Sequence, residues 1–191
     1  MTDANSRNVA QGERVALRKP AAADQAAFVA LVEASDEVRP RWVPGPQGPC
    51  GTDAVWWFQR NLEMNDDGRN IRLLVVRLED EALIGSMNLN EIVRGAFQNA
   101  FLGYWIGDPY LRQGYGGEAL QLALDYAFGP LELHRVEANI QPENEASIAL
   151  VKAAGFRYEG DSPRYLKING QWRDHQRWAL TVEEHDARLG S

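Results

Sequence analysis

Residues 104–120 read YWIGDPYLRQGYGGEAL, and this stretch decides the fold. Its first three residues are typical of a strand, residues 107–116 of a glycine-rich turn, and the apolar residues at 120, 123, 124, 127 and 128 follow the period of a helix. The first backbone N–H groups of a helix have no partner inside it, and the helix dipole adds partial positive charge there. Glycines let the backbone approach an anion closely. The segment therefore predicts a phosphate or pyrophosphate site.

The spacing of the glycines narrows the choice of ligand. Gly114, Gly116 and Gly117 form Gly-x-Gly-Gly, without the Lys-Ser/Thr pair of a nucleotide P-loop. Ala119 stands where a dinucleotide-binding Gly-x-Gly-x-x-Gly would need its last glycine. A Gly-x-Gly turn also serves as a simple tight connection, so the neighbouring segments decide between the two interpretations.

The rest of the chain predicts a sheet with helices around it. Alternating patterns between turn residues predict strands over 14–18, 71–78, 82–92, 100–106, 135–140, 156–168 and 171–182. The last two form a hairpin about Asn169-Gly170. Helices are predicted after Asp24, after Thr52 or Asp53, after Gly116, and over 144–154 before Gly155. This order indicates an α+β fold, layered α/β/α, with a mixed, mainly antiparallel sheet.

Length and charge bound the class of protein. The 191 residues, 45% of them hydrophobic, suffice for one domain with a substantial core. We expect that domain over residues 13–183, between a flexible N-terminal tail of residues 1–12 and a C-terminal tail of residues 184–191. The formal net charge of −7 argues against a nucleic-acid binder, which needs a basic face.

The cysteine count and the hydropathy pattern bear on location. Cys50 is the single cysteine, so no internal disulfide can form, and no Cys/His spacing suits a metal. No apolar run is long enough for a membrane span, and the polar start MTDANSRNVAQGE lacks the apolar region of a signal peptide. We therefore expect a cytoplasmic monomer or homodimer without a metal, and without membrane or nucleic-acid partners.

Four segments taken together resemble one enzyme family. Residues 104–120 are followed by LHRVEA at 133–138, NEAS at 144–147 and AAGF at 153–156, and this combination is similar to the GNAT N-acetyltransferase superfamily. Within it, the chain looks like the Rim-type enzymes that acetylate the N-terminal α-amino group of ribosomal proteins, because residues 93–95, 103–107 and 169–175 are similar to that subgroup. The likeness covers residues 14–182.

The resemblance implies a central sheet splayed into a V, with acetyl-CoA in the cleft. It implies that the pyrophosphate meets the backbone N–H groups of Arg112, Gln113, Gly114, Tyr115, Gly116 and Gly117. The pantetheine arm would meet the strand of Tyr104, Trp105 and Ile106, as if the cofactor were an extra strand segment. Asn144 would hydrogen-bond or position the pantetheine.

Two departures from the family pattern concern the cofactor side of the site. Leu111 stands where relatives often have Gln or Arg, so pyrophosphate binding is expected to depend on backbone N–H groups, with Arg112 as the side-chain helper. Val151 stands where many relatives have a tyrosine that protonates the leaving thiolate. Ser147, one helical turn after Asn144, is the substitute proton donor that we expect; the alternative is that its hydroxyl caps a backbone N–H.

A third departure concerns the base. The strand residues 99–101 lack the glutamate that relatives commonly carry there. Glu91 is the nearest alternative, because strand alternation would place it on the same face as Met87 and Leu89; it could also be a solvated carboxylate at a strand end. His134 and His175 are interpreted as structural. The irregular loop over residues 39–51, with Trp42, is a candidate roof for the acceptor site.

These features lead to a function with two alternatives. The expected reaction moves the acetyl group of acetyl-CoA to a primary amine, namely the N-terminal α-amino group of a protein such as a basic ribosomal protein. An α-amino group has a pKa of about 7.7–8.0, so a fair fraction is neutral and a strong base is optional. The first alternative keeps the chemistry with a small acceptor such as a polyamine, an amino acid or an antibiotic. The second is a CoA-binding module without catalysis.

Overall fold

The fold was analysed in a computed structural model, which describes residues 7–35, 54–65 and 68–190. The predicted loop over residues 39–51, Cys50 and the predicted helix start at Thr52 or Asp53 lie outside the described residues. So do residues 1–6 of the predicted N-terminal tail.

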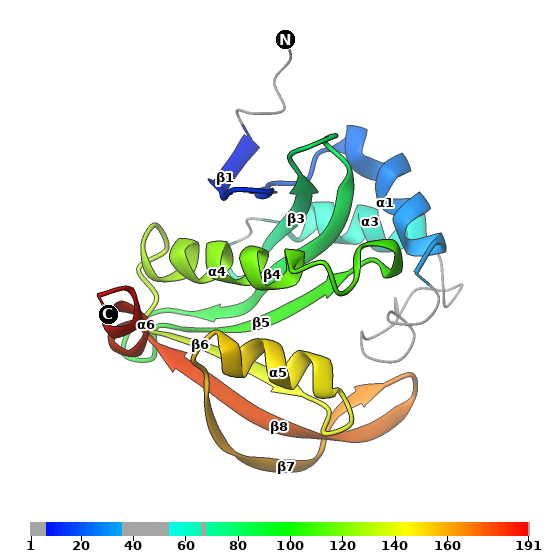
Figure 1. The fold of residues 1–191 in the computed structure, drawn as a ribbon. Helices are drawn as coiled ribbons and strands as arrows, with labels where there is room; N and C mark the ends of the chain where they lie inside the picture. The colour runs from blue at the N-terminus through cyan, green and yellow to red at the C-terminus, as the bar shows by residue number, and fades with distance from the viewer. Residues whose placement is uncertain (1–6, 36–53, 66–67, 191) are drawn as a thin grey trace.

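Eight strands form one sheet in the order β1-β2-β3-β4-β5-β6-β8-β7 (Figure 1). The strands are β1 (Asn8–Gln11), β2 (Val15–Arg18), β3 (Ile71–Arg77), β4 (Leu83–Val93), β5 (Asn99–Ile106), β6 (Arg135–Ile140), β7 (Arg157–Ile168) and β8 (Gln171–Thr181). All neighbours pair antiparallel except β5 and β6, which are parallel. The predicted α+β class and the mainly antiparallel sheet are confirmed.

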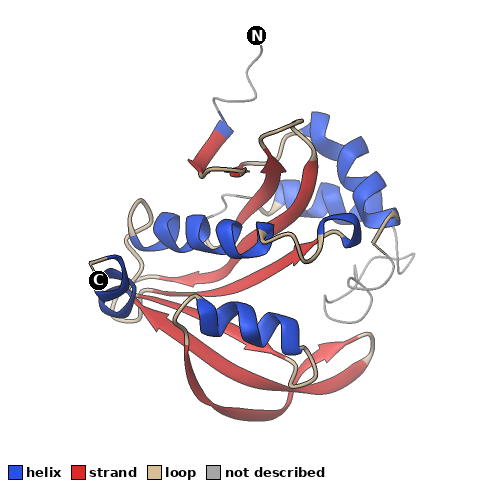
Figure 2. Cartoon of the chain, in the orientation of Figure 1, coloured by secondary structure: helices blue, strands red, loops and turns tan. Residues whose placement is uncertain are grey.

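Helices cover both faces of this sheet (Figure 2). They are α1 (Gln25–Glu33), α3 (Ala54–Glu63), α4 (Tyr115–Phe128), α5 (Glu145–Ala153) and α6 (Val182–Leu189), with short 3-10 turns η2 (Ala22–Asp24) and η3 (Asp108–Tyr110). The main core lies between the sheet and the α4/α5 layer and includes Leu120, Leu124 and Val151. A second core on the other face joins α1 and α3 to β3 and β5 through Phe28, Phe58 and Trp105, among others.

The parallel pair of strands opens the sheet. β5 and β6 are in register over only three pairs, from Asn99 with Arg135 to Phe101 with Glu137. Beyond this point β6 continues to pair with β8, whereas β5 continues to pair with β4. The edge of β5 over residues 102–106 is therefore not paired with β6, and the two strands diverge as a V between α4 and α5 (Figure 1).

The two chain ends are more ordered than their polar sequences predict. Residues 8–11 were expected in a loose tail, but they form β1, which pairs with β2. Residues 184–189 were also expected in a tail, but they belong to α6, where the backbone N–H of Thr181 donates to Glu184 at 2.9 Å and the buried His185 packs on the ring of Phe128. Both tail predictions are wrong there. Pairing with β2, and in α6 the hydrogen bond to Glu184 and the packing on Phe128, stabilise segments whose local sequence pattern predicts no helix or strand.

Candidate active site

The loop between β5 and α4 exposes a row of backbone donors. Arg112 has φ +59° and Gly114, the N-cap residue of α4, has φ +83°, so the chain folds back tightly before the helix. Within the described part of the chain, the backbone N–H groups of residues 112–116 donate to no other protein group. These donors lie at the positive end of a 14-residue helix, where an anion is stabilised.

A side chain from the first hairpin braces this loop. The guanidinium of Arg14 donates to the carbonyl of Gln113 at 3.0 Å and to Glu118 at 3.1 Å, and it lies 5.1 Å from the ring centre of Tyr115. Glu118 also accepts the backbone N–H groups of Arg14 and Val15. Burial alone would raise the pKa of Glu118, but these hydrogen bonds outweigh it and lower the pKa. The sequence offers no signal for this contact, because about a hundred residues separate its partners.

The side chains of the loop leave the donors accessible. Leu111 is half-buried and packs against the main core, while the Arg112 side chain is exposed. The side chain of Gln113 donates to the carbonyl of Pro109 at 3.0 Å, so it stays within the loop. That an anion here would meet mainly backbone N–H groups stays a prediction.

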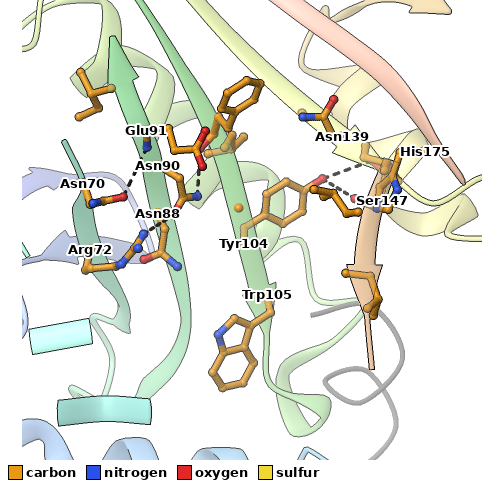
Figure 3. A pocket seen from close by; sticks show the side chains of 18 of the residues that line it. Asn70, Arg72, Asn88, Asn90, Glu91, Tyr104, Trp105, Asn139, Ser147 and His175 are labelled. Carbon is orange, nitrogen blue, oxygen red and sulfur yellow. Dashed lines mark hydrogen bonds between the residues drawn. The ribbon is translucent and has the colours of Figure 1, made fainter. Parts of the chain in front are cut away.

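A pocket of about 890 Å³ occupies the open part of the V (Figure 3). It brings together Tyr104, Trp105, Asn144, Ser147 and Glu91, five of the residues that the sequence singled out. Ile106 and residues 112–117 are not among the described residues that line it. The phosphate-type loop and the pocket are therefore separate parts of the site, connected by β5.

Tyr104 and Ser147 meet across the V (Figure 3). The Tyr104 hydroxyl lies 2.5 Å from the Ser147 hydroxyl and 3.5 Å from the Ser147 carbonyl. Burial raises the pKa of Tyr104 to about 12. The cap of α5 is Asn144, whose Oδ1 accepts the backbone N–H of Ser147 at 3.2 Å. The alternative interpretation of Ser147 as a capping hydroxyl is therefore wrong, because Asn144 is the cap and the Ser147 hydroxyl contacts a tyrosine of β5.

Trp105 lies on the opposite side of β5 from the main core. Its ring stacks on Trp57 at 5.8 Å between ring centres and meets Phe28 edge-on at 6.0 Å. Its side chain therefore belongs to the second core.

Glu91 is not on the face that strand alternation predicts. The register of β4 with β5 shifts between Asn90 and Val93, and Glu91 has φ +51° within this bulge. Ile92, not Glu91, continues the core face of Met87 and Leu89. A bulge inserts one residue and turns the next side chains to the other face. Glu91 is consequently exposed at the rim of the pocket, so the prediction of a shared face was wrong.

The remaining pocket wall is rich in amide groups. Arg72 donates to the Asn90 side chain, whose Nδ2 donates to the carbonyl of Phe101 at 3.0 Å, and the Ser86 hydroxyl donates to Asn88. Of the described lining residues, Arg69, Arg72 and Glu91 carry full charges. His175 also lines the pocket and is buried, a placement that the structural interpretation of this residue did not include.

Among residues 7–35, 54–65 and 68–190, no cluster of three or more His, Cys, Asp or Glu side chains is arranged to hold a metal ion. In the same ranges no helix is both long and apolar enough to cross a membrane.

Comparison with known proteins places this geometry in a family. The model of the acetyltransferase (GNAT) domain matches residues 14–157. The [ribosomal protein uS5]-alanine N-acetyltransferase of Escherichia coli (strain K12) is 40% identical over 106 residues, 56% of this chain and 55% of that protein, so the chain spans about half of that relative. The spermidine N(1)-acetyltransferase of the same strain is 31% identical over 143 residues, 68% of this chain and 74% of that protein.

A solved structure extends the match to the fold. Mycobacterium smegmatis RimJ in complex with CoA-disulfide superposes with a TM-score of 0.80 at 30% identity, over 89% of this chain and 83% of that chain. The V-shaped sheet and the matched residues 14–157 lead to one conclusion. This chain belongs to the GNAT acetyltransferase domain family.

Proposed function

We propose that this protein transfers the acetyl group of acetyl-CoA to the N-terminal α-amino group of a protein or peptide. The observation that carries the proposal is the V between β5 and β6, which has a row of unused backbone donors at one end and an amide-lined pocket in its opening. The first feature suits a pyrophosphate and the second suits a peptide.

The residues present fit CoA. The backbone donors of residues 112–116 would hold the pyrophosphate, and the edge of β5 over residues 102–106 offers the backbone groups that a pantetheine amide needs. Asn144 lies at the start of α5, beside that edge. When bound, the cosubstrate supplies an acetyl thioester, an acyl group with a good leaving thiolate.

Ser147 and Tyr104 supply the proton that the leaving group needs. The amine nitrogen forms a bond to the thioester carbonyl carbon, the carbon–sulfur bond breaks, and the thiolate takes a proton from the Ser147 hydroxyl. Because the pKa of Tyr104 is about 12, its phenol stays protonated at neutral pH and can donate to the Ser147 oxygen as that hydroxyl gives up its proton. Positioning of the amine in the pocket supplies a further part of the rate.

The charge of the pocket favours a peptide over a polyamine. Its described lining carries two arginines and one exposed carboxylate, so a polyamine with several ammonium groups would meet more positive than negative charge. Asn70 and Asn88 line the pocket with amide groups, a kind of group that can match the amides of an extended peptide. The volume of about 890 Å³ accommodates more than one residue of such a chain.

Release of the CoA thiol tests the proposal against its alternatives. The acceptors are a short peptide with a free N-terminus, the same peptide with an acetylated N-terminus, spermidine and free alanine, each with acetyl-CoA. We expect thiol release with the free peptide alone, and a mass increase of one acetyl group at its first residue. Faster turnover of spermidine or alanine than of the free peptide would show that the acceptor is a small amine. Tight CoA binding without thiol release in any arm would support the non-catalytic module.

A further inference from the structure

We propose that His175 is the general base of this site and accepts the proton that the acceptor amine loses. The inference rests on the proposed acetyl transfer and deepens it by naming the second partner in the proton exchange. His175 touches the pocket, whereas residues 99–101 of β5 carry no carboxylate.

The local geometry fixes the tautomer of His175. Its Nδ1 lies 3.0 Å from the carbonyl oxygen of Arg173. Because a carbonyl oxygen only accepts, Nδ1 must carry the hydrogen, and in the neutral ring Nε2 keeps its lone pair. The residue is 3% exposed and forms no ion pair with any described residue, and it lines the pocket, so the pocket is where an acceptor could reach this lone pair.

The sheet turns His175 toward the acceptor side of the V. Along β8, Trp178 and Leu180 enter the main core beneath α4 and α5, so His175 and Arg177 lie on the opposite face. Asn88 and Asn90 of β4 also lie on that face, across the pocket (Figure 3). An acceptor between these two walls would present its amine to β5 from the side on which the imidazole lies.

The side-chain oxygen of Asn139, another residue of the pocket lining, has no hydrogen-bond partner among the described residues. Asn139 of β6 shares the face of Arg177, to which it is opposed in register, and it lines the same pocket. Its side-chain oxygen is shielded from solvent and accepts no hydrogen bond from any described residue. A buried acceptor without a donor is costly, and an amine N–H would satisfy it. Asn139 thus orients the amine while His175 takes its proton.

The surroundings keep the imidazole neutral at pH 7. Burial lowers the pKa of His175, and the hydrogen bond to the Arg173 carbonyl and the carboxylates of Asp174 and Glu143 offset this only in part. The ring of Tyr165 packs on the imidazole at 5.8 Å from the β7 side. The other charged groups of the described pocket lining are Arg69, Arg72 and Glu91. A neutral imidazole is the form that a base requires.

The proton balance of the reaction closes with this assignment. As the nitrogen–carbon bond forms, the amine nitrogen becomes positive and its proton passes to Nε2 of His175. The carbon–sulfur bond breaks and the sulfur takes the proton of Ser147. The Tyr104 phenol reprotonates the Ser147 oxygen. Afterwards the imidazolium releases a proton to solvent and Tyr104 takes one up, so the protein returns to its starting state.

The decisive variant is His175→Asn, which keeps an N–H donor near the position of Nδ1 but has no basic nitrogen. His134→Asn is the matched control, because His134 is exposed at the start of β6 and pairs with Glu183 outside the pocket. We expect H175N to lower kcat/KM for the peptide about 10²–10⁴-fold with an unchanged KM for acetyl-CoA. The control should match the wild type. A loss of less than about threefold in H175N would overturn the assignment.

A pH profile separates a base from a merely structural histidine. The acceptor for this measurement is a peptide that starts with an aminooxyacetyl group, whose nitrogen stays neutral over the range. Because burial lowers the pKa of His175 from its ordinary value of about 6.5, wild-type kcat/KM should decrease only below that pH, as the imidazole is protonated, and H175N should show no such decrease. If kcat/KM of H175N decreases over the same acid range, the decrease belongs to another group and the proposal is overturned.

Chemical rescue covers the case in which H175N folds poorly. Imidazole added to His175→Ala should restore part of the rate, and it should leave His134→Ala unchanged; a failure of rescue in a folded H175A would count against the base. If wild-type protein releases no thiol with any amine, the proposed function itself fails. Wild-type turnover together with active histidine variants rejects only the role of His175.

Discussion

The hydroxyl of Tyr104 on β5 lies 2.5 Å from the hydroxyl of Ser147 on α5, so one hydrogen bond crosses the open part of the V. The two residues are 43 positions apart and belong to elements on either side of the divergence. The bond places a proton donor beside the edge of β5 where the cosubstrate is expected. Under the proposed function, this pair takes the role that the resemblance assigns to a tyrosine at the position of Val151.

Removal of either hydroxyl should slow the chemical step unequally. Ser147→Ala deletes the group that gives its proton to sulfur, so kcat should fall about 10²-fold. Tyr104→Phe leaves Ser147 in place but removes one hydrogen bond of about 1.4 kcal/mol, so kcat should fall about tenfold. Steady-state thiol release measures both. The double variant should be no slower than S147A, because the phenol acts through the serine; additive losses would contradict this relay.

The positive φ of Gly114 should matter for CoA binding. Gly114→Ala forces an alanine to φ +83° and places its Cβ 3.1 Å from the guanidinium of Arg14, so the loop must shift. Gly95→Ala is the matched control, since Gly95 has φ +71° and nothing within 4 Å of an added Cβ. Both variants should lose about 1–2 kcal/mol of stability. Calorimetric titration should show CoA binding weakened in G114A alone, and abolished in Gly114→Asp, which aims a carboxylate at the pyrophosphate. Equal CoA affinity in G114D and wild type would show that the pyrophosphate does not bind at this loop.

Arg14 should contribute to cofactor affinity although it lies outside the loop. Arg14→Ala removes the donor to the Gln113 carbonyl, the ion pair with Glu118 and the cation over Tyr115. We expect the Kd for CoA to rise about tenfold, equivalent to about 1.4 kcal/mol. Arg60→Ala, which breaks an exposed pair with Glu63 on α3, should leave this Kd unchanged. A Kd for R14A within twofold of wild type would show that the brace is only structural.

Glu159 should make stability depend on pH in the acid range. Its hydrogen bonds first to Arg135 and then to Arg157 lower the pKa from 4.5 to about 2. A carboxylate with a lowered pKa stabilises the folded state above its unfolded value, and this contribution is lost as the pH falls from about 4.5 toward 2. The difference in free energy of unfolding between wild type and Glu159→Gln should be about 1 kcal/mol at pH 6 and should vanish near pH 2.

Urea unfolding at several pH values measures this difference. Glu79→Gln, an exposed carboxylate on the turn between β3 and β4, is the control and should track the wild type throughout. If the difference in free energy of unfolding between wild type and E159Q stays constant with pH, the ion pairs do not lower the pKa of Glu159 in the folded state.

Local patterns predicted the parts of the fold that depend on local chemistry. Asn169 and Gly170 have φ +49° and +82°, as the hairpin turn requires, and Gly155 ends α5 with φ +91°. Asn144 begins α5 as its N-cap. In each case one residue and its immediate neighbours determine the backbone, so a single sequence suffices.

The parts that could not be predicted depend on distant contacts. The bulge at Glu91 changes which side chains face the core, and no residue type in that stretch marks it. Arg14 meets Gln113 only after β2 and α4 have packed together. The Tyr104–Ser147 contact requires the V to have formed. Period and spacing predict the face of a side chain only where the strand has no bulge, and they do not reveal which remote partner the side chain contacts.

The three register pairs between β5 and β6 have a mechanical consequence. Strands β1 to β5 form one plate of the sheet and strands β6 to β8 another, and in the sheet only the backbone hydrogen bonds of these three pairs hold the plates together at a short joint. A ligand lying along residues 102–106 would supply the missing length of sheet and stiffen the joint. Amide hydrogens on both plates, including those far from any ligand atom, would then exchange more slowly in the loaded protein than in the empty one.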